Sequence, residues 1–385
     1  MIKLSSINHN KTKRDDMDIS KLLEFMVSKE ASDLYLTTGA PPQIKIYGKI
    51  MSCDLPALKS GDTAMIAHSL MSEEQTRHFN KNLEMNLAIS QKNIGRFRVN
   101  IFQQRSEISL VIRHIKSVIP SIAELNLPPV LNQLIMKQRG LILIVGATSS
   151  GKSTTLATMI EHRNQTSASH IITIEDPIEY IHTHKKSLVN QREIGIDTLS
   201  YSQALKNTLR QAPDVILIGE IRDQETMQYA INFAETGHLC LSTLHANNAN
   251  QAFERIINFF PQNAHQQLLL DLSLNTVAII SQRLIPSIEG KRVPATEILL
   301  GSPLVKELIS KGEINELKEA MEKSNDIGMQ TFDMALYNLY QNKIISAEDA
   351  LKYADSENNL RLKISLSKGS SPHAGDDLSL QNEKD

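Results

Sequence analysis

The fold of this chain is decided by one short stretch, Gly146-Ala147-Thr148-Ser149-Ser150-Gly151-Lys152-Ser153. An apolar run at 141–145 enters it like a buried strand, and residues 153–164 leave it like a helix. The glycines let the backbone curl so that successive N–H groups hold phosphate oxygens, while Lys152 adds a positive charge and Ser153 can ligate Mg²⁺. With Thr154, the stretch predicts a site for ATP. A glycine-rich turn without chemistry is the alternative, but strand, loop and helix agree against it.

The composition is that of a globular protein with more than one domain. Its 385 residues are 41% hydrophobic and 22% charged, which is ample material for cores. A net charge of -2 offers no broad basic field, so nucleic acid is not an expected partner. No apolar run approaches the roughly 18 residues that span a bilayer, and the polar N-terminus does not resemble a signal peptide. Cys53 and Cys240 cannot build a four-cysteine zinc site, and we expect both in the core of a cytoplasmic protein.

The first third of the chain predicts a small α+β domain over residues 18–116. Apolar residues recur at helical spacing from Ile19, and a second helix is expected at 63–70. Short runs separated by turns indicate an antiparallel sheet with strands at 33–37, 43–50, 83–89, 96–103 and 107–115. Residues 1–17 are expected to be a disordered polar arm, and a proline-containing linker is expected at 117–130.

The pattern then changes to alternating strands and helices, which predicts an α/β domain over residues 131–301. Its strand-like runs are short and apolar on both faces, as in a parallel sheet covered by helices, and lie at 141–145, 171–174, 215–218 and 239–244. A helix from Asp223 to Glu235 has an acidic cap and ends near a glycine. We expect a helical subdomain at 302–363 and a disordered tail at 364–385.

An acidic cluster follows the run at 171–174. Glu175, Asp176 and Glu179 would be delivered by one strand end, and ligands of open parallel sheets bind at the carboxyl ends of the strands. Carboxylates in that place can hold Mg²⁺ or orient an attacking water. The alternative is a merely solvated loop.

A further acid, Glu220, comes two residues after the run at 215–218. Four apolar residues followed by an acid have the form of a Walker B strand, which makes Glu220 the expected metal-side carboxylate beside Ser153. The next charged residues, Arg222 and Asp223, could form a structural salt bridge or serve the function.

Two histidines flank the run at 239–244. Because they are seven residues apart, His238 and His245 are expected to point to opposite faces, so one metal site binding both is not expected. His245 follows the carboxyl end of the strand, where the nucleotide should lie, and is a candidate sensor or catalytic residue. His238 is a second candidate, and a structural role is the alternative for both.

Strand alternation also gathers arginines in the N-terminal domain. Arg96, Arg98 and Asn100 should share one sheet face, with Arg113 on the next strand. With few nearby acids to pair them, these arginines favour an anionic partner, such as the nucleotide bound by a neighbouring subunit of a ring. An ordinary solvated face is the alternative.

In their order, these motifs resemble those of the secretion and type IV pilus motor ATPases. The resemblance covers roughly residues 18–363 and rests on the stretches 31–36, 95–100, 146–153, 174–179, 190–195, 219–223 and 236–245. It implies a PAS-like domain followed by a RecA-like ATPase domain, assembled as a hexameric ring. It also implies that Glu179 is the general base, that Glu220 fills the Walker B role and that His238 and His245 form a His box.

Within this family the chain resembles the PilT/PilU retraction ATPases, and most of all the PilU branch, in its residues 212–214, 245–251 and 319–324. Extension motors carry a four-cysteine zinc site, which two cysteines cannot supply. Where the PilT branch has Ala-Ile-Arg-Asn-Leu, this chain reads Leu304-Val305-Lys306-Glu307-Leu308. The resemblance implies an accessory motor that works with a PilT-type ATPase and an inner-membrane platform protein at the pilus base.

The expected activity is therefore ATP hydrolysis that powers pilus retraction and twitching motility. Glu179 would activate water, and an arginine of the adjacent subunit would sense the γ-phosphate. Two other classes of function stay open. A small-molecule kinase would need an acceptor pocket, for which the sequence offers no candidate. A nucleotide-dependent ring scaffold would hydrolyse little ATP of its own.

Overall fold

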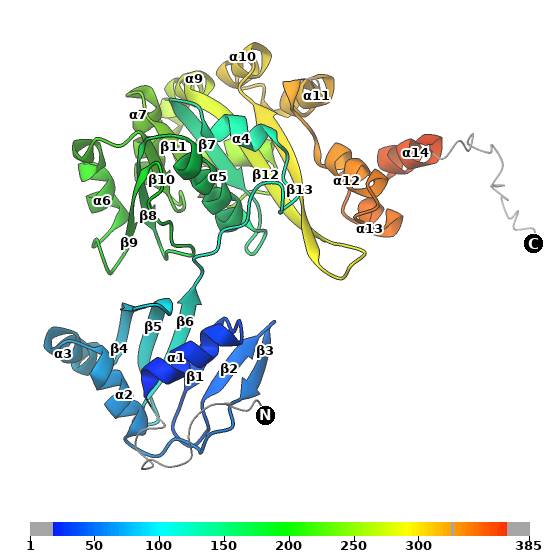
Figure 1. Ribbon diagram of the computed structural model, residues 1–385. Helices are drawn as coiled ribbons and strands as arrows, with labels where there is room; N and C mark the ends of the chain where they lie inside the picture. The colour runs from blue at the N-terminus through cyan, green and yellow to red at the C-terminus, as the bar shows by residue number, and fades with distance from the viewer. Residues whose placement is uncertain (1–17, 325–326, 368–385) are drawn as a thin grey trace, which may run out of the picture. The chain divides into compact units, whose positions relative to one another are not determined.

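The computed structural model describes residues 18–324 and 327–367, which divide into two compact units (Figure 1). The first unit consists of the chain as far as Ile119 together with Ile174–Thr183 and Gln191–Ala204. The second unit consists of Pro120–Thr173, His184–Asn190 and the chain from Leu205 onward. The arm expected at residues 1–17 and the tail from 368 lie outside the described residues.

The first unit contains an antiparallel sheet, which over the described residues has six strands in the order β3-β2-β1-β6-β5-β4. The strands are β1 (Asp33–Leu36), β2 (Gln43–Ile46), β3 (Lys49–Ser52), β4 (Glu84–Gln91), β5 (Gly95–Gln104) and β6 (Glu107–Ile115). The helices are α1 (Ile19–Ser28), α2 (Asp62–Leu70) and α3 (Glu73–Asn82). The expected antiparallel α+β arrangement is therefore observed.

Alternation along β5 separates the core from the arginine face, as the sequence predicts. Phe97, Val99 and Ile101 are fully buried and belong to the apolar core of this unit. Arg96 and Arg98 lie on the opposite face and are half-buried. The period of two in the sequence thus decides which side chains of β5 can meet a charged partner.

Two expectations for the first unit are wrong in detail. The run 43–50 is not one strand but part of the hairpin β2–β3, because Tyr47 (φ 48°) and Gly48 (φ 81°) form its two-residue turn. Helix α3 was not expected, since Phe79 is its one buried residue and its other positions are polar. Its signal was the capping box in which Ser72 and Gln75 bond each other's backbone N–H groups.

The second sheet is mainly parallel, as expected, and over the described residues has seven strands in the order β13-β12-β7-β11-β10-β8-β9. The strands β12, β7, β11 and β10 pair in parallel, and β13 is antiparallel to β12. Their bounds are β7 (Gly140–Val145), β8 (His170–Glu175), β9 (Leu188–Glu193), β10 (Val215–Ile218), β11 (Leu239–Leu244), β12 (Thr276–Pro286) and β13 (Arg292–Leu300).

Helices accompany this sheet and continue into the C-terminal region. The helices up to residue 275 are α4 (Val130–Ile135), α5 (Lys152–Thr166), α6 (Tyr201–Thr208), η2 (Leu209–Gln211), α7 (Gln224–Glu235), α8 (Ala249–Asn258), η3 (Gln262–Ala264) and α9 (His265–Asn275). The later ones are α10 (Pro303–Lys311), η4 (Ile314–Glu316), α11 (Leu317–Lys323), α12 (Phe332–Gln341), α13 (Ala347–Lys352) and α14 (Glu357–Ser367). The helical region expected from 302 is observed, and α14 runs past position 363, where we expected it to end.

The strands β9, β12 and β13 were not predicted. β12 follows α9 without a turn residue, and its apolar run is interrupted by Ser281, Gln282 and Arg283. Two of these polar residues are nonetheless buried: Ser281 is 0% exposed and Gln282 is 3% exposed. A buried polar strand residue needs a hydrogen-bond partner from elsewhere in the fold, which a local pattern cannot reveal.

Both cysteines are free and buried, as expected, Cys53 in the first unit and Cys240 on β11. Over the described residues, no helix combines the length and the apolar character that crossing a bilayer requires.

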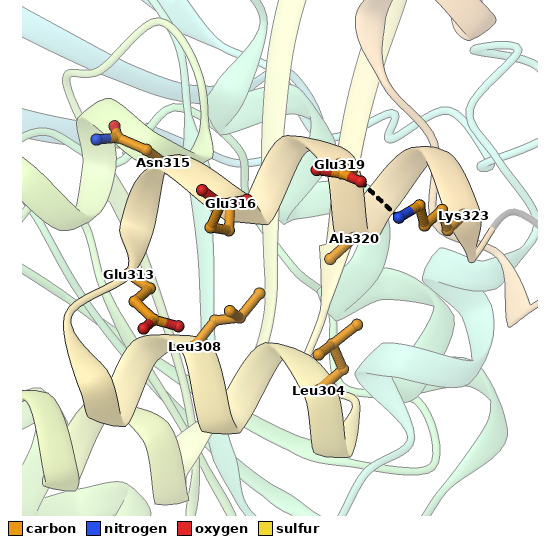
Figure 2. Close-up of a pocket in the computed structure, with 8 residues that line it drawn as sticks. All are labelled: Leu304, Leu308, Glu313, Asn315, Glu316, Glu319, Ala320 and Lys323. Atoms are coloured by element: carbon orange, nitrogen blue, oxygen red, sulfur yellow. Dashed lines mark hydrogen bonds and ion pairs between the residues drawn. The ribbon is translucent and has the colours of Figure 1, made fainter.

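A groove of about 600 Å³ lies between α10 and the segment η4–α11 (Figure 2). Leu304, Leu308 and Ala320 supply its apolar lining, and acidic side chains, among them Glu316 and Glu319, line it as well. The stretches 304–308 and 319–324, which the sequence comparison within the family singled out, therefore line one surface.

Candidate nucleotide site

The loop between β7 and α5 has the backbone of a phosphate cradle. Gly151 has φ +92°, a left-handed conformation that favours glycine. A Cβ atom at Gly146 would lie 2.5 Å from the Ser150 hydroxyl and 2.5 Å from the carbonyl oxygen of Gln282. Both glycines are thus required by geometry, and the loop they form opens directly into the N-terminus of α5, which favours an anion.

Lys152 lies across the mouth of this loop. Its ammonium group donates hydrogen bonds to the carbonyl oxygens of Gly146 at 2.8 Å and Ala147 at 2.9 Å. Burial lowers the pKa of Lys152, and the negative charge of Glu220 opposes that shift. The ammonium group is therefore positioned at the loop by weak neutral acceptors that phosphate oxygens can replace with stronger, charge-assisted bonds.

Ser150 is the unusual residue of the loop. Its hydroxyl oxygen is buried and, among the described residues, makes no hydrogen bond. A buried hydroxyl without a partner costs free energy, so its presence points to a ligand atom that completes it. Ser153, in contrast, is exposed in the first turn of α5, where a hydroxyl can reach a metal ion on the phosphates.

Glu220 follows β10, and its carboxylate contacts one histidine and one arginine. Its Oε1 lies 3.0 Å from the Nε2 atom of His245, and its Oε2 accepts from Arg222, with Nε at 2.8 Å and Nη2 at 2.7 Å. Of the two roles left open for Arg222, the structure shows an ion pair with Glu220. Asp223 instead caps α7 by accepting from the backbone N–H of Thr226 at 2.8 Å.

His245 lies at the same edge of the sheet as the loop. β11 pairs with β7 in parallel up to Leu244 opposite Val145, so the next residues along the two strands, His245 and Gly146, are neighbours. Burial lowers the pKa of His245, the charge of Lys152 lowers it further, and Glu220 opposes both. The imidazole is therefore neutral near pH 7 and can accept or donate a hydrogen bond at the phosphates.

His238 is not brought to this edge. It precedes β11 at the opposite end of the strand, roughly 20 Å from His245 at about 3.3 Å per residue. Its Nδ1 atom lies 3.1 Å from the Thr236 hydroxyl and 3.2 Å from the carbonyl oxygen of Phe233, at the C-terminal end of α7. A catalytic role for His238 in the nucleotide loop of its own unit does not fit this position.

The acidic cluster at the end of β8 belongs to the first unit. Glu175 ends the strand and accepts from the Gln191 side chain at 3.3 Å, and Gln191 also donates to the carbonyl oxygen of Tyr180 at 2.8 Å. Asp176 and Glu179 follow on the exposed loop. Of the three carboxylates, Glu175 is thus held in the sheet, whereas Glu179 is exposed and accessible.

The expectation that few acids pair the arginines is wrong. The Nε atom of Arg98 lies 3.7 Å from the carboxylate of Glu193, which is 0% exposed, and the buried Nε of Arg96 makes no hydrogen bond among the described residues. Burial raises the pKa of Glu193, and the charges of Arg98 and Arg96 oppose that shift. The acid comes from 95 residues further along the chain than Arg98, which is why local sequence did not show it.

Arg113 also has an acidic partner. β1 and β6 place Asp33 directly opposite Arg113, whose Nε donates to the Asp33 carboxylate at 2.8 Å. This hydrogen bond raises the pKa of Arg113, burial opposes the shift, and the charges of Asp33 and Glu179 add to it more weakly. Arg113 remains 59% exposed, compared with 26% for Arg98, so it is the better placed of the two to reach a further anion.

Comparison with known proteins shows the family to which this chain belongs. The family model described as type II/IV secretion system protein matches residues 16–324. The chain is 54% identical over 351 residues to the type IV pilus ATPase PilU of Pseudomonas aeruginosa, covering 91% of this chain and 92% of that protein. This chain belongs to the PilT/PilU family of type IV pilus motor ATPases.

Other members of the family agree in sequence and in structure. The PilT retraction ATPase of P. aeruginosa is 40% identical over 89% of this chain and 100% of its own length. The crystal structure of the pilus retraction motor PilT with bound ADP superposes with a TM-score of 0.83 at 41% identity, covering 90% of this chain and 99% of that one. The RecA-like α/β fold expected from the resemblance is thus confirmed, and nucleotide binding is a property of the family.

Several residues of the candidate site were missed from the sequence. Asp33 carried a usable signal, since an acid beginning a strand that pairs with β6 can meet Arg113. Glu193 lay inside a family stretch but had no assigned partner. Gln191 lay inside the same family stretch, also without an assigned partner. Gln282 gave no signal, because a glutamine reveals neither the strand that it will join nor the backbone groups that it will bind.

The residues of the loop fit a magnesium ion by their chemistry. Mg²⁺ prefers oxygen ligands and is usually held by one or two protein groups together with substrate phosphates. Ser153 offers a hydroxyl and Glu220 a carboxylate at the correct edge of the sheet. Over the described residues, no group of three or more His, Cys, Asp or Glu that could hold a metal ion is found.

Proposed function

We propose that this protein is a hexameric, ATP-hydrolysing motor that contributes to type IV pilus retraction and twitching motility, as an accessory to a PilT-type motor. The single observation that carries the proposal is the nucleotide loop with its unpartnered Ser150 hydroxyl, in a chain 54% identical to a PilU protein. A ligand that brings several phosphate oxygens satisfies this loop, and a motor of this family uses that ligand as fuel.

In the proposed cycle each residue has one task. The loop amides of residues 146–151 and the ammonium group of Lys152 bind the phosphates, and Thr154 follows them in the first turn of α5. Ser153 and Glu220 would hold Mg²⁺, which neutralises charge on the phosphates when bound. Glu179 takes a proton from the attacking water. His245 is neutral and contacts Glu220, so its imidazole responds to a change in the charge around that carboxylate. Glu175 fixes the start of the acidic loop through its bond to Gln191.

An arginine from a neighbouring subunit completes the proposed site. We assign this task to Arg113 first, because its guanidinium is 59% exposed and its Nε is the atom that bonds Asp33. Arg96 and Arg98 support the same face through Glu193. Loss of the γ-phosphate would release the arginine and free the junction between subunits, so that hydrolysis around the ring becomes rotation.

The remaining assignments follow from the family resemblance. We propose a cytoplasmic location at the inner-membrane base of the pilus, with a platform protein and a PilT-type ATPase as partners. We also propose the domain limits 18–116, 131–301 and 302–363. The divergent stretch 304–308, which lines the acidic groove of α10 and α11, supports an accessory rather than an autonomous role.

One observation favours a second candidate function. Both carboxylate oxygens of Glu220 are engaged, one by His245 and one by Arg222. A carboxylate held in this way is poorly available to a metal, as in a ring scaffold that binds ATP and hydrolyses little. The exposed Glu179 argues against the scaffold, which would have no use for a general base.

The proposal is tested with two variants of the purified protein, Arg113→Ala and the double variant Arg96→Ala/Arg98→Ala. We expect Arg113→Ala to bind ADP normally and to release phosphate at least 100-fold more slowly than the wild type, as for other arginines supplied in trans. The double variant should also lose turnover, and its folding is measured beside it because it removes the two cations next to the buried Glu193. Undiminished phosphate release by both variants would contradict the trans arginine and the ring that depends on it.

A further inference from the structure

Gln282, on β12, lies behind the nucleotide loop and contacts it from two sides. Its side-chain amide donates through Nε2 to the carbonyl oxygen of Ser150 at 2.9 Å. Its Oε1 accepts from the hydroxyl of Thr155, on α5, at 2.7 Å. The residue is 3% exposed, and both bonds are buried. One side chain therefore joins the last part of the loop to the helix that follows it.

The two glycines of the loop are also fitted to this residue. A Cβ atom at Gly151 would lie 2.7 Å from Nε2 of Gln282, and one at Gly146 would lie 2.5 Å from its backbone carbonyl oxygen. Both distances are below any real contact of a Cβ atom, so the loop approaches β12 as closely as its backbone allows. Gly146 at the beginning of the loop and Gly151 at its end thus both lie directly against Gln282.

The bond to Ser150 fixes the direction of a phosphate-binding amide. In a trans peptide the C=O and the following N–H point in opposite directions. Because the carbonyl of Ser150 faces Gln282, the N–H of Gly151 must point away from β12, toward the concavity of the loop. Without Gln282 the carbonyl would lose its buried partner, and rotation of this peptide would turn the N–H away from the phosphates.

We propose that Gln282 is a positioning residue for nucleotide binding, one that holds the Ser150–Gly151 peptide and the first turn of α5 in the orientation that phosphate requires. The inference rests on the proposed nucleotide function of the same loop. It adds a residue that touches no ligand and acts through the backbone it orients. Loss of Gln282 should therefore weaken ADP binding more than a comparable loss elsewhere in the sheet.

A matched control is available in the same unit. The side chain of Gln330 donates to the carbonyl oxygen and to the hydroxyl of Thr296, on β13, at 2.8 and 2.9 Å. Like Gln282, it ties a sheet strand to another segment by two hydrogen bonds. It bonds none of the loop residues, so Gln330→Met reports the effect of losing such bonds on stability alone.

The test compares the wild type, Gln282→Met, Gln282→Glu and Gln330→Met by titration with a fluorescent ADP analogue and by urea unfolding. Methionine keeps the length of glutamine but neither bond. Glutamate keeps the acceptor for Thr155 but places an acceptor oxygen against the Ser150 carbonyl. We expect the Kd for ADP to rise at least tenfold in both Gln282 variants and less than twofold in Gln330→Met, with the KM for ATP rising in parallel.

The outcomes distinguish a failure of the inference about Gln282 from a failure of the proposed nucleotide function. Either folded Gln282 variant binding ADP within twofold of the wild type would overturn the positioning role, as would an equal loss of affinity in Gln330→Met. Should Gln282→Met fail to fold, Gln282→Glu decides the question. A wild-type protein that bound no ADP would instead overturn the proposed function itself, together with the inference.

Discussion

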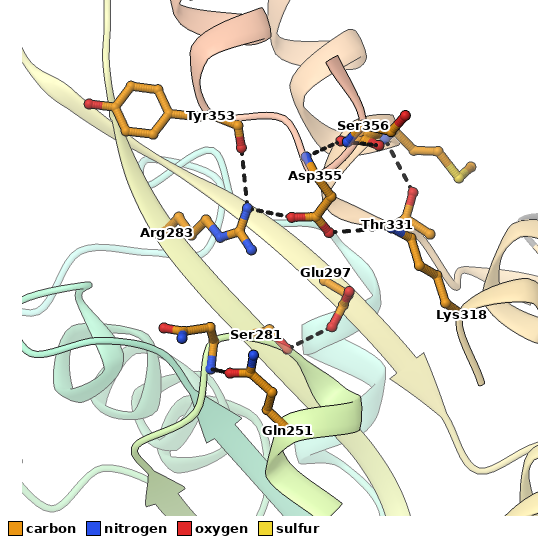
Figure 3. A network of polar contacts seen from close by, with 12 residues as sticks. Gln251, Ser281, Arg283, Glu297, Lys318, Thr331, Tyr353, Asp355 and Ser356 are labelled. Atoms are coloured by element: carbon orange, nitrogen blue, oxygen red, sulfur yellow. Dashed lines mark hydrogen bonds and ion pairs between the residues drawn. The ribbon is translucent and has the colours of Figure 1, made fainter. Parts of the chain in front are cut away.

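The nucleotide loop and the network around Arg283 use half-buried charge in opposite ways. In the loop, Lys152 donates to two carbonyl oxygens of its own turn. The buried Ser150 hydroxyl makes no hydrogen bond within the described residues. In the network, the Arg283 guanidinium donates to Asp355 at 2.8 Å and to the carbonyl oxygen of Tyr353 at 3.2 Å (Figure 3). One region keeps hydrogen-bonding capacity for a ligand, and the other uses it to hold helices together.

The network is the more complete of the two. The Arg283 guanidinium also stacks over the ring of Phe332 with its central carbon 3.8 Å from the ring centroid, and Lys318 lies 3.6 Å from the second oxygen of Asp355. These contacts connect β12 with α11, α12 and the turn before α14. The comparison implies that a charge removed from the loop should cost function with little loss of stability, whereas a charge removed from the network should do the reverse.

The largest expected effect is that of Lys152→Ala. Phosphate release should fall at least 100-fold, because the variant lacks the ammonium group that Lys152 places at the loop. Its free energy of unfolding should remain at or slightly above the wild-type value, since burial already disfavours the charged lysine. Phosphate release and urea unfolding measure the two quantities. A large loss of stability would break the comparison, because it would show that the loop depends on Lys152 for its structure.

The second effect is that of Arg283→Met, which should lower the free energy of unfolding by about 2 kcal/mol, a typical value for a charge-assisted hydrogen bond with a cation–π contact. Its Kd for ADP should stay within twofold of the wild type. Arg361→Met is the matched control, because Arg361 forms an exposed pair with Glu357 and should cost less than about 0.5 kcal/mol. Equal losses in the two variants would show that the network adds nothing beyond a surface ion pair.

The smallest effect concerns Glu297, which is 2% exposed and accepts from the N–H of Ala249. Its carboxylate also accepts from the hydroxyl of Ser281 (Figure 3). Burial raises its pKa, and these hydrogen bonds oppose the shift. A carboxyl whose pKa is raised by folding contributes stability below its unfolded pKa and loses it as pH rises through the folded value. The stability of Glu297→Gln relative to the wild type should therefore increase from pH 4 to pH 8. The variant Glu289→Gln, at a side chain 80% exposed, should show no such trend.

Local sequence predicted the structure correctly wherever a feature depends on residues that are close together in the chain. The loop, its flanking strand and helix, the cap of α7 by Asp223 and the alternation of β5 all depend on neighbours in the chain, and all are observed. Even the hairpin β2–β3 could have been inferred, because a glycine at its turn interrupts the run that we took for one strand.

The rest depends on partners distant in sequence. Asp33 meets Arg113 across 80 residues, and Gln282 meets Ser150 across 132. Such pairs form only after sheet order and register are fixed, and the sheet order places β12 beside β7 although most of the second unit separates them in the chain. Polar residues on a buried strand conceal that strand from a search for apolar runs, which is how β12 and its glutamine were missed.

The central claim, that the loop belongs to a working ATPase with Glu179 as its general base, is tested most directly by steady-state phosphate release from the wild type beside Glu179→Gln. We predict measurable turnover by the wild type and a rate at least 100-fold lower in the variant, with the Kd for ADP unchanged because the exposed Glu179 is not needed to bind the nucleotide. Equal rates in the two proteins would contradict the assignment of the base, and no turnover in either would favour the ring scaffold.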